Sequence, residues 1–139
     1  MEDPLFGRLQ WDRESQWWEG SIPAAPGEFF TLSIQPRSGV DRSIGEAARH
    51  IYAQLRSDFE GIRRRALQEF LAGTRDQPFY QALTLEQLLS NLRPDGIMVR
   101  GDGYMEIGFA DRDEKVIGGG HSIVSRFWPD GTREVVLEG

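Results

Sequence analysis

The residues of this chain best suited to acid–base chemistry or metal binding are its two histidines, His50 and His121. His50 falls about 120° from the centre of a predicted helix stripe at roughly 100° per residue, so we expect it to face solvent. His121 shares a predicted strand face with Ile123 and Phe127, and we expect it to be partly buried. Two interpretations of His121 stay open, a hydrogen-bonded structural residue and a functional one.

Three consecutive glycines, Gly118 to Gly120, precede His121, so the backbone there is able to come close to another element or to a ligand. A phosphate-binding loop is followed by a helix whose N-terminus supplies aligned N–H groups. Here the glycines lead into a predicted strand, and no Gly-Lys-Ser/Thr follows. A nucleotide loop is therefore not expected, but His121 with this segment stays the candidate centre of an enzyme or small-ligand site.

Nucleophilic and metal chemistry find little support in the composition. The chain has no cysteine, which excludes thiolate nucleophiles, thiolate metal sites and disulfides. Ser122 follows His121 directly, and neighbours on a strand point to opposite faces, so they cannot pair as nucleophile and base without a bulge. One partly buried histidine also leaves a four-coordinate zinc site short of ligands. We predict no catalytic residue, no metal and no cofactor.

Acidic and aromatic side chains are the remaining candidates for function. Asp111, Asp113 and Glu114 form an acidic stretch in a predicted loop, but without the spacing of an EF-hand. Trp17 and Trp18 are adjacent and cannot face the same side of one strand, so one is exposed or is covered by another element. Exposed tryptophan is a good interface anchor. The predicted binding residues are His121, Gly120, Trp17, Trp18, Asp111, Asp113 and Glu114.

The balance of charge bears on the kind of partner. The chain carries 22 acidic and 16 basic residues, a formal net charge of −6. Residues 76–139 hold 11 of the acids and only 6 of the bases. A groove for nucleic-acid phosphates needs a local excess of bases, so nucleic acid is not expected as a partner. The acidic field favours a basic protein, although the alternative that the charge only maintains solubility stays open.

The length and the apolar runs predict one domain outside the membrane. A chain of 139 residues is close to the commonest domain size, so we take residues 1–139 as a single domain. No apolar run reaches the roughly 18 residues that a membrane span requires. The acidic N-terminus has no apolar signal-peptide segment, and the expected compartment is therefore the cytoplasm. The sequence makes no prediction of oligomeric state.

Period-two alternation predicts β-strands at both ends of the chain. Strands at 5–11, 17–22 and 29–34 are joined by short turns, which indicates an antiparallel meander. Near the C-terminus two hairpins are predicted, with turns at 101–103 and 129–131.

Apolar residues spaced three and four apart predict helix between residues 43 and 72. One continuous helix would extend about 45 Å, more than the diameter of about 37 Å expected for such a domain. Ser57 and Glu60 fit a capping box and Gly61 weakens a helix, so we predict two helices, or one sharply kinked, with the break between Ser57 and Gly61.

A further short helix is predicted from the capping box of Thr84 and Gln87, ending at Pro94-Asp95-Gly96. The order of strands, helices and strands indicates an α+β fold. We expect a largely antiparallel β-sheet, made of an N-terminal meander and C-terminal hairpins, with two or three central helices packed on one face. A doubly wound nucleotide-binding fold is not expected, because strands and helices do not alternate.

Three short motifs carry a resemblance to a known family. They are the opening residues 6–9 (Phe-Gly-Arg-Leu), the strand entry 120–123 (Gly-His-Ser-Ile) and the closing hairpin at 130–131 (Asp-Gly). With the order of elements along nearly the whole chain, they resemble the bacterial family catalogued as domain of unknown function 2262. The chain departs from that pattern at 116–119, which reads Val-Ile-Gly-Gly where relatives tend to place an aromatic pair. The family has no established activity, so the resemblance implies a fold and no catalytic residue.

Several similar small acidic α+β domains are immunity or accessory proteins of bacterial toxin systems. The sequence therefore favours a non-catalytic protein-binding domain, with such an immunity or accessory role as its most specific form. The alternative is an enzyme or small-ligand-binding protein centred on His121 and the segment Gly118–Gly120.

Overall fold

The computed structural model describes residues 1–25, 28–111, 113–118 and 120–139 of the chain. Its main feature is a seven-stranded sheet in which the spatial order of the strands follows the chain, β3-β4-β5-β6-β7-β8-β9. Neighbouring strands are antiparallel apart from β5 and β6, which are parallel. The strands are β3 (Gln10–Asp12), β4 (Trp17–Ala25), β5 (Glu28–Ile34), β6 (Arg93–Val99), β7 (Met105–Ala110), β8 (Ser122–Phe127) and β9 (Arg133–Glu138).

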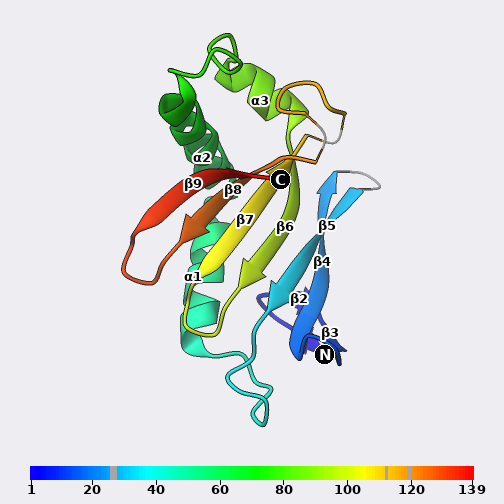
Figure 1. Ribbon diagram of the computed structural model, residues 1–139. Helices are drawn as coiled ribbons and strands as arrows, with labels where there is room; N and C mark the ends of the chain where they lie inside the picture. Colours follow the sequence, from blue (N-terminus) through cyan, green and yellow to red (C-terminus); the bar gives the residue numbers. More distant parts are fainter. Residues whose placement is uncertain (26–27, 112, 119) are drawn as a thin grey trace.

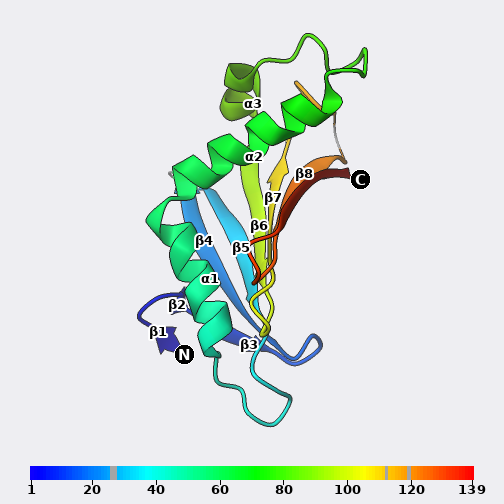
Figure 2. The same ribbon diagram turned by 90° about the vertical axis from the view of Figure 1, so that its left-hand side faces the viewer.

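The described helices all lie between β5 and β6 in the chain: α1 (Glu46–Ser57), α2 (Phe59–Thr74) and α3 (Leu85–Asn91). Figure 1 shows α1 and α2 behind the sheet, and Figure 2 shows that both helices lie along one face of it. This long connection returns the chain from the end of β5 to the start of β6, as a parallel pair requires. The arrangement confirms the predicted α+β fold, a largely antiparallel sheet with helices on one face. None of the described helices is long and apolar enough to cross a membrane.

The hydrophobic core lies between the helices and the sheet face that they cover. Leu32 of β5 pairs with Ile97 of β6, and Ile97 pairs with Ile107 of β7, so these three buried side chains share that face. Helix α1 supplies buried residues at helical spacing, among them Ala48 and Leu55. The apolar stripes that predict the elements are therefore the surfaces that meet in the core.

The predicted break in the helical region is confirmed at Asp58, which lies between α1 and α2. The capping residue differs from the one expected. The Asp58 side chain accepts a hydrogen bond from the Gly61 N–H at 3.2 Å, whereas the Ser57 hydroxyl donates to the Gln54 carbonyl at 2.8 Å. The predicted capping box of Ser57 and Glu60 is wrong, because the N-cap of α2 is Asp58, one residue further on, whose carboxylate lies over the first turn of the helix.

The single strand predicted at 5–11 is also wrong. In its place β1 (Glu2–Asp3) and β2 (Gly7–Arg8) form a separate two-stranded sheet, and β3 begins only at Gln10. The reason is local, since the Asp3 carboxylate accepts hydrogen bonds from the N–H groups of Leu5 and Phe6 and folds the chain into a turn. The same carboxylate binds Arg49 of α1, which fixes this sheet to the helix.

The short helix predicted to end at residues 94–96 ends slightly earlier, at Asn91, and residues 94–96 do not separate it from the next strand. They belong to β6, which carries a bulge between Pro94 and Gly96. A bulge accommodates proline because the residue without an N–H need not take part in the ladder. The short helix predicted from Thr84 and Gln87 is confirmed, with both hydrogen bonds of its capping box present. The predicted hairpins at 101–103 and 129–131 are confirmed as the connections of β6 to β7 and of β8 to β9.

Candidate functional site

The sheet face opposite the helices, which we call the open face, is covered by none of the described helices (Figure 1). Its side chains alternate along the strands with those of the core, and in β7 every second residue is buried and the others are half-buried. The register places Glu106 of β7 opposite Arg126 of β8, which in turn lies opposite Glu134 of β9. Charged residues from three strands thus meet on this face.

Arg126 is the centre of an ion-pair cluster on the open face. Its guanidinium lies 3.4 Å from the Glu106 carboxylate, 3.5 Å from that of Glu134 and 2.5 Å from that of Glu138. Three carboxylates around one guanidinium leave an excess of negative charge. These ion pairs cross between strands, so they also hold the acidic side chains in fixed positions.

Tyr104 extends the Arg126 cluster toward the turn between β6 and β7. Its hydroxyl donates a hydrogen bond to the Glu106 carboxylate at 2.5 Å. Burial, together with this bond and the negative charge of Glu106, raises the pKa of Tyr104 to about 12. Tyr104 therefore stays protonated near neutral pH and acts as a donor that orients Glu106.

A hollow of about 400 Å³ lies on the open face beside this cluster. Four glycines line it, and at one of them, Gly96, a Cβ atom would lie 3.0 Å from the Thr31 hydroxyl. The polar and acidic residues lining the hollow are Thr31, Ser33, Asp95, Glu106, Ser122 and Glu138. Its lining combines carboxylates with hydroxyl groups, a chemistry that suits a positively charged group.

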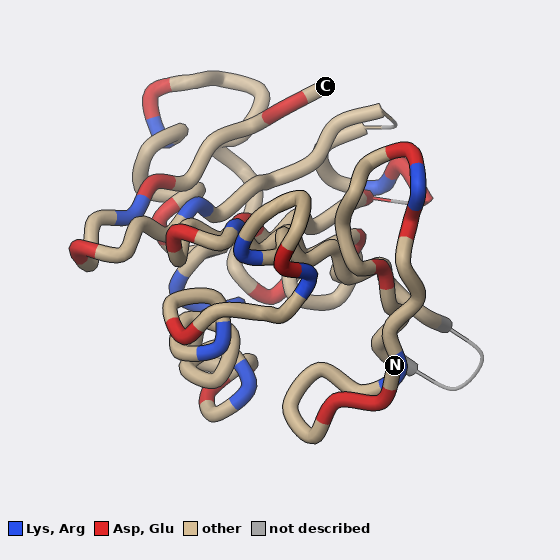
Figure 3. Tube along the Cα trace, turned by 90° about the horizontal axis from the view of Figure 1, so that it is seen from below, with Lys and Arg blue, Asp and Glu red and all other residues tan. Residues whose placement is uncertain are grey.

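Charge over the rest of the surface is mixed. Figure 3 shows acidic and basic residues distributed along the trace, with an acidic segment directly before the C-terminus. That segment is Glu138, which belongs both to the Arg126 cluster and to the hollow. The acidic character of the open face thus comes from the carboxylates of β7 and β9, whereas charge over the rest of the surface is mixed.

The predicted segment around His121 lies at one end of the open face. His121 is half-buried, as expected, but its ring forms no hydrogen bond with another described residue, so the predicted structural partner is not found there. Gly120 lines the hollow, and a Cβ atom at Gly139 would collide with the Gly120 carbonyl. The backbone of this segment thus comes close to Gly139, the residue after β9, although a Cβ atom at Gly120 itself would meet nothing within 4 Å. Gly119 lies outside the described residues.

The acidic stretch after β7 differs from its prediction at Asp111. Asp111 is 3% exposed, and its carboxylate accepts four backbone N–H hydrogen bonds, from residues 115 to 118. Burial raises the pKa of this carboxyl, but the backbone hydrogen bonds outweigh burial and lower the pKa below its usual value. Asp111 thus folds its own loop and is not available to a partner. Asp113 and Glu114 are exposed, and Arg112 between them and Asp111 lies outside the described residues.

The tryptophan pair divides between the two faces of the sheet, as predicted. Trp18 packs edge-on against Trp11 with ring centroids 5.1 Å apart, and its ring N–H donates to the Arg42 carbonyl at 2.7 Å. Trp17 points to the opposite side of β4 and is half-buried. Trp18 is therefore the covered member of the pair, and Trp17 lies on the same side as the open face.

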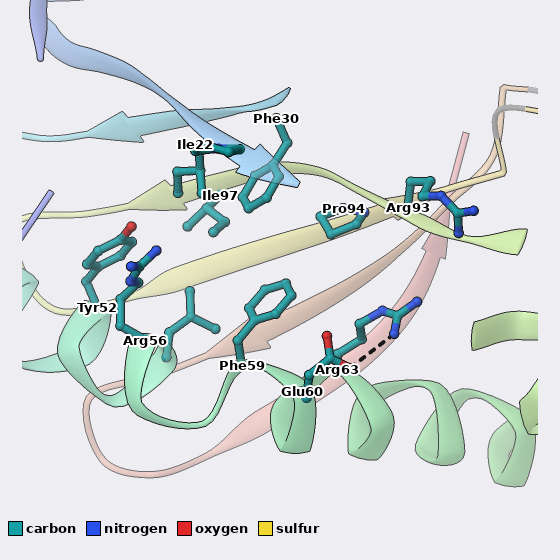
Figure 4. Close-up of a pocket in the computed structure, with 12 residues that line it drawn as sticks. Ile22, Phe30, Tyr52, Arg56, Phe59, Glu60, Arg63, Arg93, Pro94 and Ile97 are labelled. Carbon is teal, nitrogen blue, oxygen red and sulfur yellow. Dashed lines mark hydrogen bonds and ion pairs between the residues drawn. The ribbon is translucent and has the colours of Figure 1, made fainter. Parts of the chain in front are cut away.

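A second concave site, which we call the kink cavity, lies on the helix side of the sheet where α1 meets α2. It has a volume of about 450 Å³ and is lined from β4, β5, β6 and the two helices (Figure 4). Its apolar lining residues are Ile22, Pro23, Phe30, Leu55, Phe59, Pro94 and Ile97, and its polar ones are Tyr52, Arg56, Glu60, Arg63 and Arg93. The cavity thus combines an apolar interior with three cationic side chains.

Neither the Arg126 cluster nor the kink cavity follows from the sequence analysis. The cluster joins three strands, so finding it requires the register of the two C-terminal hairpins. For the cavity a signal was present, because Arg63 follows Phe59 by four residues and so lies on the same helix face as the apolar stripe.

Among the described residues, no group of three or more histidine, cysteine, aspartate or glutamate side chains is placed to hold a metal ion. Comparison of the chain with models of protein families, with curated proteins and with solved structures gives no match, so its resemblance to domain of unknown function 2262 stays a prediction.

Proposed function

We propose that this protein is a non-catalytic protein-binding domain that binds a basic partner through its open face. The observation that carries the proposal is the Arg126 cluster beside the hollow, where carboxylates outnumber guanidinium groups on an uncovered sheet face. Complementary charge steers association and favours partners of the opposite sign.

The geometry supports binding by carboxylates that are already held in place. Glu106 is bound by Arg126 and by the Tyr104 hydroxyl, and Ser33 donates a hydrogen bond to Glu19 at 2.8 Å across β4 and β5. Side chains fixed in this way lose less conformational freedom when a partner binds. A lysine or arginine of the partner would enter the hollow and meet Asp95 and Glu138.

The most specific form of the proposal is an immunity or accessory protein of a bacterial toxin system, acting in the cytoplasm. Nuclease toxins are basic because they bind phosphate, so an acidic face suits a protein that inhibits one. The same charge disfavours nucleic acid and anionic membranes as partners. The resemblance to domain of unknown function 2262 is part of this proposal and supports a binding role, since it carries over no catalytic residue.

The test is affinity capture from the native host with the unaltered protein and two variants of equal charge. Glu134→Gln with Glu138→Gln changes the open face, whereas Asp76→Asn with Glu86→Gln changes exposed acids on the helix side. A basic protein should be captured, then purified and titrated. We expect the open-face variant to bind about tenfold more weakly, since it loses two exposed charge contacts.

The control variant should keep its affinity within about twofold, and higher salt should weaken binding of the unaltered protein. Capture of nucleic acid, or an equal loss of affinity in both variants, would contradict the proposal.

A further inference from the structure

The kink cavity lies on the other side of the sheet from the open face, so the proposed protein partner does not account for it. Its interior is apolar and buried, with Phe30 5% and Ile97 3% exposed. The rings of Phe30 and Phe59 are stacked with centroids 6.3 Å apart. A volume of about 450 Å³ falls in the range of roughly 300–1,000 Å³ that is typical of small-molecule sites.

Positive charge collects at this cavity although the protein is acidic. Three arginines line it, Arg56, Arg63 and Arg93, against a single acid, Glu60. In Figure 4, Arg56 lies beside Tyr52 at one end of the cavity and Arg93 lies at the other, with Arg63 reaching from α2 toward that second end. The excess of cations is therefore strongest where Arg63 and Arg93 approach each other.

Arg63 and Arg93 share one hydrogen-bond acceptor, the carbonyl of Leu92. A guanidinium nitrogen of Arg63 lies 3.4 Å from this carbonyl oxygen, and one of Arg93 lies 3.3 Å from it. The two positively charged groups are therefore separated by no more than about two hydrogen-bond lengths. Arg63 has an ion pair with Glu60 at 3.2 Å, but Arg93 has none with a described residue. One further negative charge at this end would balance the pair.

Arg63 also has a donor without an acceptor. Its side chain is 14% exposed, and its Nε–H is buried with no hydrogen-bond partner among the described residues. Buried donors in folded proteins nearly always have a partner, so this one indicates a position for an acceptor that binds from outside the chain. A carboxylate oxygen is a strong acceptor for guanidinium N–H groups.

From these observations we propose that the kink cavity binds a small organic anion with one carboxylate on an apolar body. The carboxylate binds at Arg63 and Arg93, and the apolar body lies against Phe30, Phe59 and Ile97. Two shapes share this chemistry, an aliphatic chain and a flat aromatic ring system. This inference does not depend on the proposed protein partner.

The test titrates the isotopically labelled protein with octanoate, 2-naphthoate, octanol and inorganic phosphate, and follows the backbone amides by NMR. We expect at least one of the two carboxylates to bind with a dissociation constant of about 1 mM or below. Shifts should be confined to cavity residues such as Phe30, Phe59 and Ile97. Octanol should bind at least about tenfold more weakly than octanoate or 2-naphthoate, whichever binds, because it lacks the charge.

A test variant and a control variant, each of which loses one positive charge, are compared. Arg93→Gln removes a cavity cation and should weaken carboxylate binding about tenfold or more. Arg64→Gln changes an exposed arginine of α2 outside the cavity and should leave binding within about twofold.

Tight binding by octanol or by phosphate alone would overturn the proposal, as would equal effects of the two variants. Amide shifts at Ser122 and Glu138 in place of the cavity residues, or failure of both carboxylates to bind, would also overturn it. The mapping of shifts on the unaltered protein decides the question even if Arg93→Gln fails to fold.

Discussion

The carboxylate of Asp58 occupies the space that a side chain at Gly61 would need. Its Oδ1 atom accepts a hydrogen bond from the Gly61 N–H at 3.2 Å, and a Cβ atom at Gly61 would contact both carboxylate oxygens. The two residues together set the start of α2 and the bend from α1, beside which the kink cavity lies.

This relationship predicts energetic coupling between Asp58 and Gly61. Asp58→Ala should lower the free energy of unfolding by about 1 kcal/mol, because α2 loses its cap. With Asp58 absent, Gly61→Ala should raise stability by up to about 1 kcal/mol through helix propensity. With Asp58 present this gain should vanish, because the new methyl group displaces the cap. Urea denaturation of the unaltered protein, the two single variants and the double variant measures the coupling. An equal effect of Gly61→Ala with and without Asp58 would exclude it.

The ion pair of Asp3 and Arg49 predicts a pH dependence of stability. The hydrogen bond from Arg49, with those from Phe6 and Leu5, lowers the pKa of Asp3 from 3.8 to about 2 against the opposing effect of burial. A lowered pKa in the folded state stabilises the fold fully above pH 3.8, and this contribution is lost as the pH falls through about 2.

The contribution of Asp3 amounts to about 2 kcal/mol, since one pKa unit corresponds to about 1.4 kcal/mol. Urea unfolding at about pH 5 and about pH 2 should therefore show the stability gap between the unaltered protein and Asp3→Asn narrowing by about that amount. If the difference in unfolding free energy between the unaltered protein and Asp3→Asn is the same at both pH values, folding does not lower the pKa of Asp3.

Asp111 is predicted to stabilise the fold and not to bind a partner. Asp111→Ala leaves the N–H groups of Lys115, Val116, Ile117 and Gly118 without their acceptor. The free energy of unfolding should fall by about 2–3 kcal/mol, the cost of unsatisfied buried donors. The neighbouring change Asp113→Asn, at an exposed position, should alter it by less than about 0.5 kcal/mol. Thermal or urea unfolding compares the two, and similar effects would contradict a structural role that is particular to Asp111.

Local patterns predicted the elements well where the determining contacts are close in sequence. The capping box of Thr84 and Gln87 and the bend before Gly61 each depend on residues within one helical turn, so the sequence was sufficient to find them. The turn at Asp3 depends on equally local hydrogen bonds, but alternation of apolar residues carries no signal for it. That is why the strand predicted at 5–11 is broken in the structure.

The candidate sites could not be predicted in the same way, because they combine residues that are distant in the chain. Glu106, Arg126 and Glu134 meet only through the register of three strands. Arg63 and Arg93 come together only because α3 and β6 return along α2. The sequence indicates a surface acid at Asp111, because residue type alone does not distinguish a carboxylate that binds its own loop from one that faces solvent.

Carboxyl footprinting of the captured complex measures directly which face of the protein the partner covers. Water-soluble carbodiimide and an amine label exposed carboxylates, and mass spectrometry compares labelling of the free and the bound protein. Glu134 and Glu138 are about half exposed in the free protein, and Glu86 on the helix side is more exposed still. Binding through the open face predicts that labelling of Glu134 and Glu138 falls several-fold in the complex while Glu86 and Asp76 are labelled as before. Protection of Glu86 and Asp76 with unchanged labelling of Glu134 and Glu138 would contradict it.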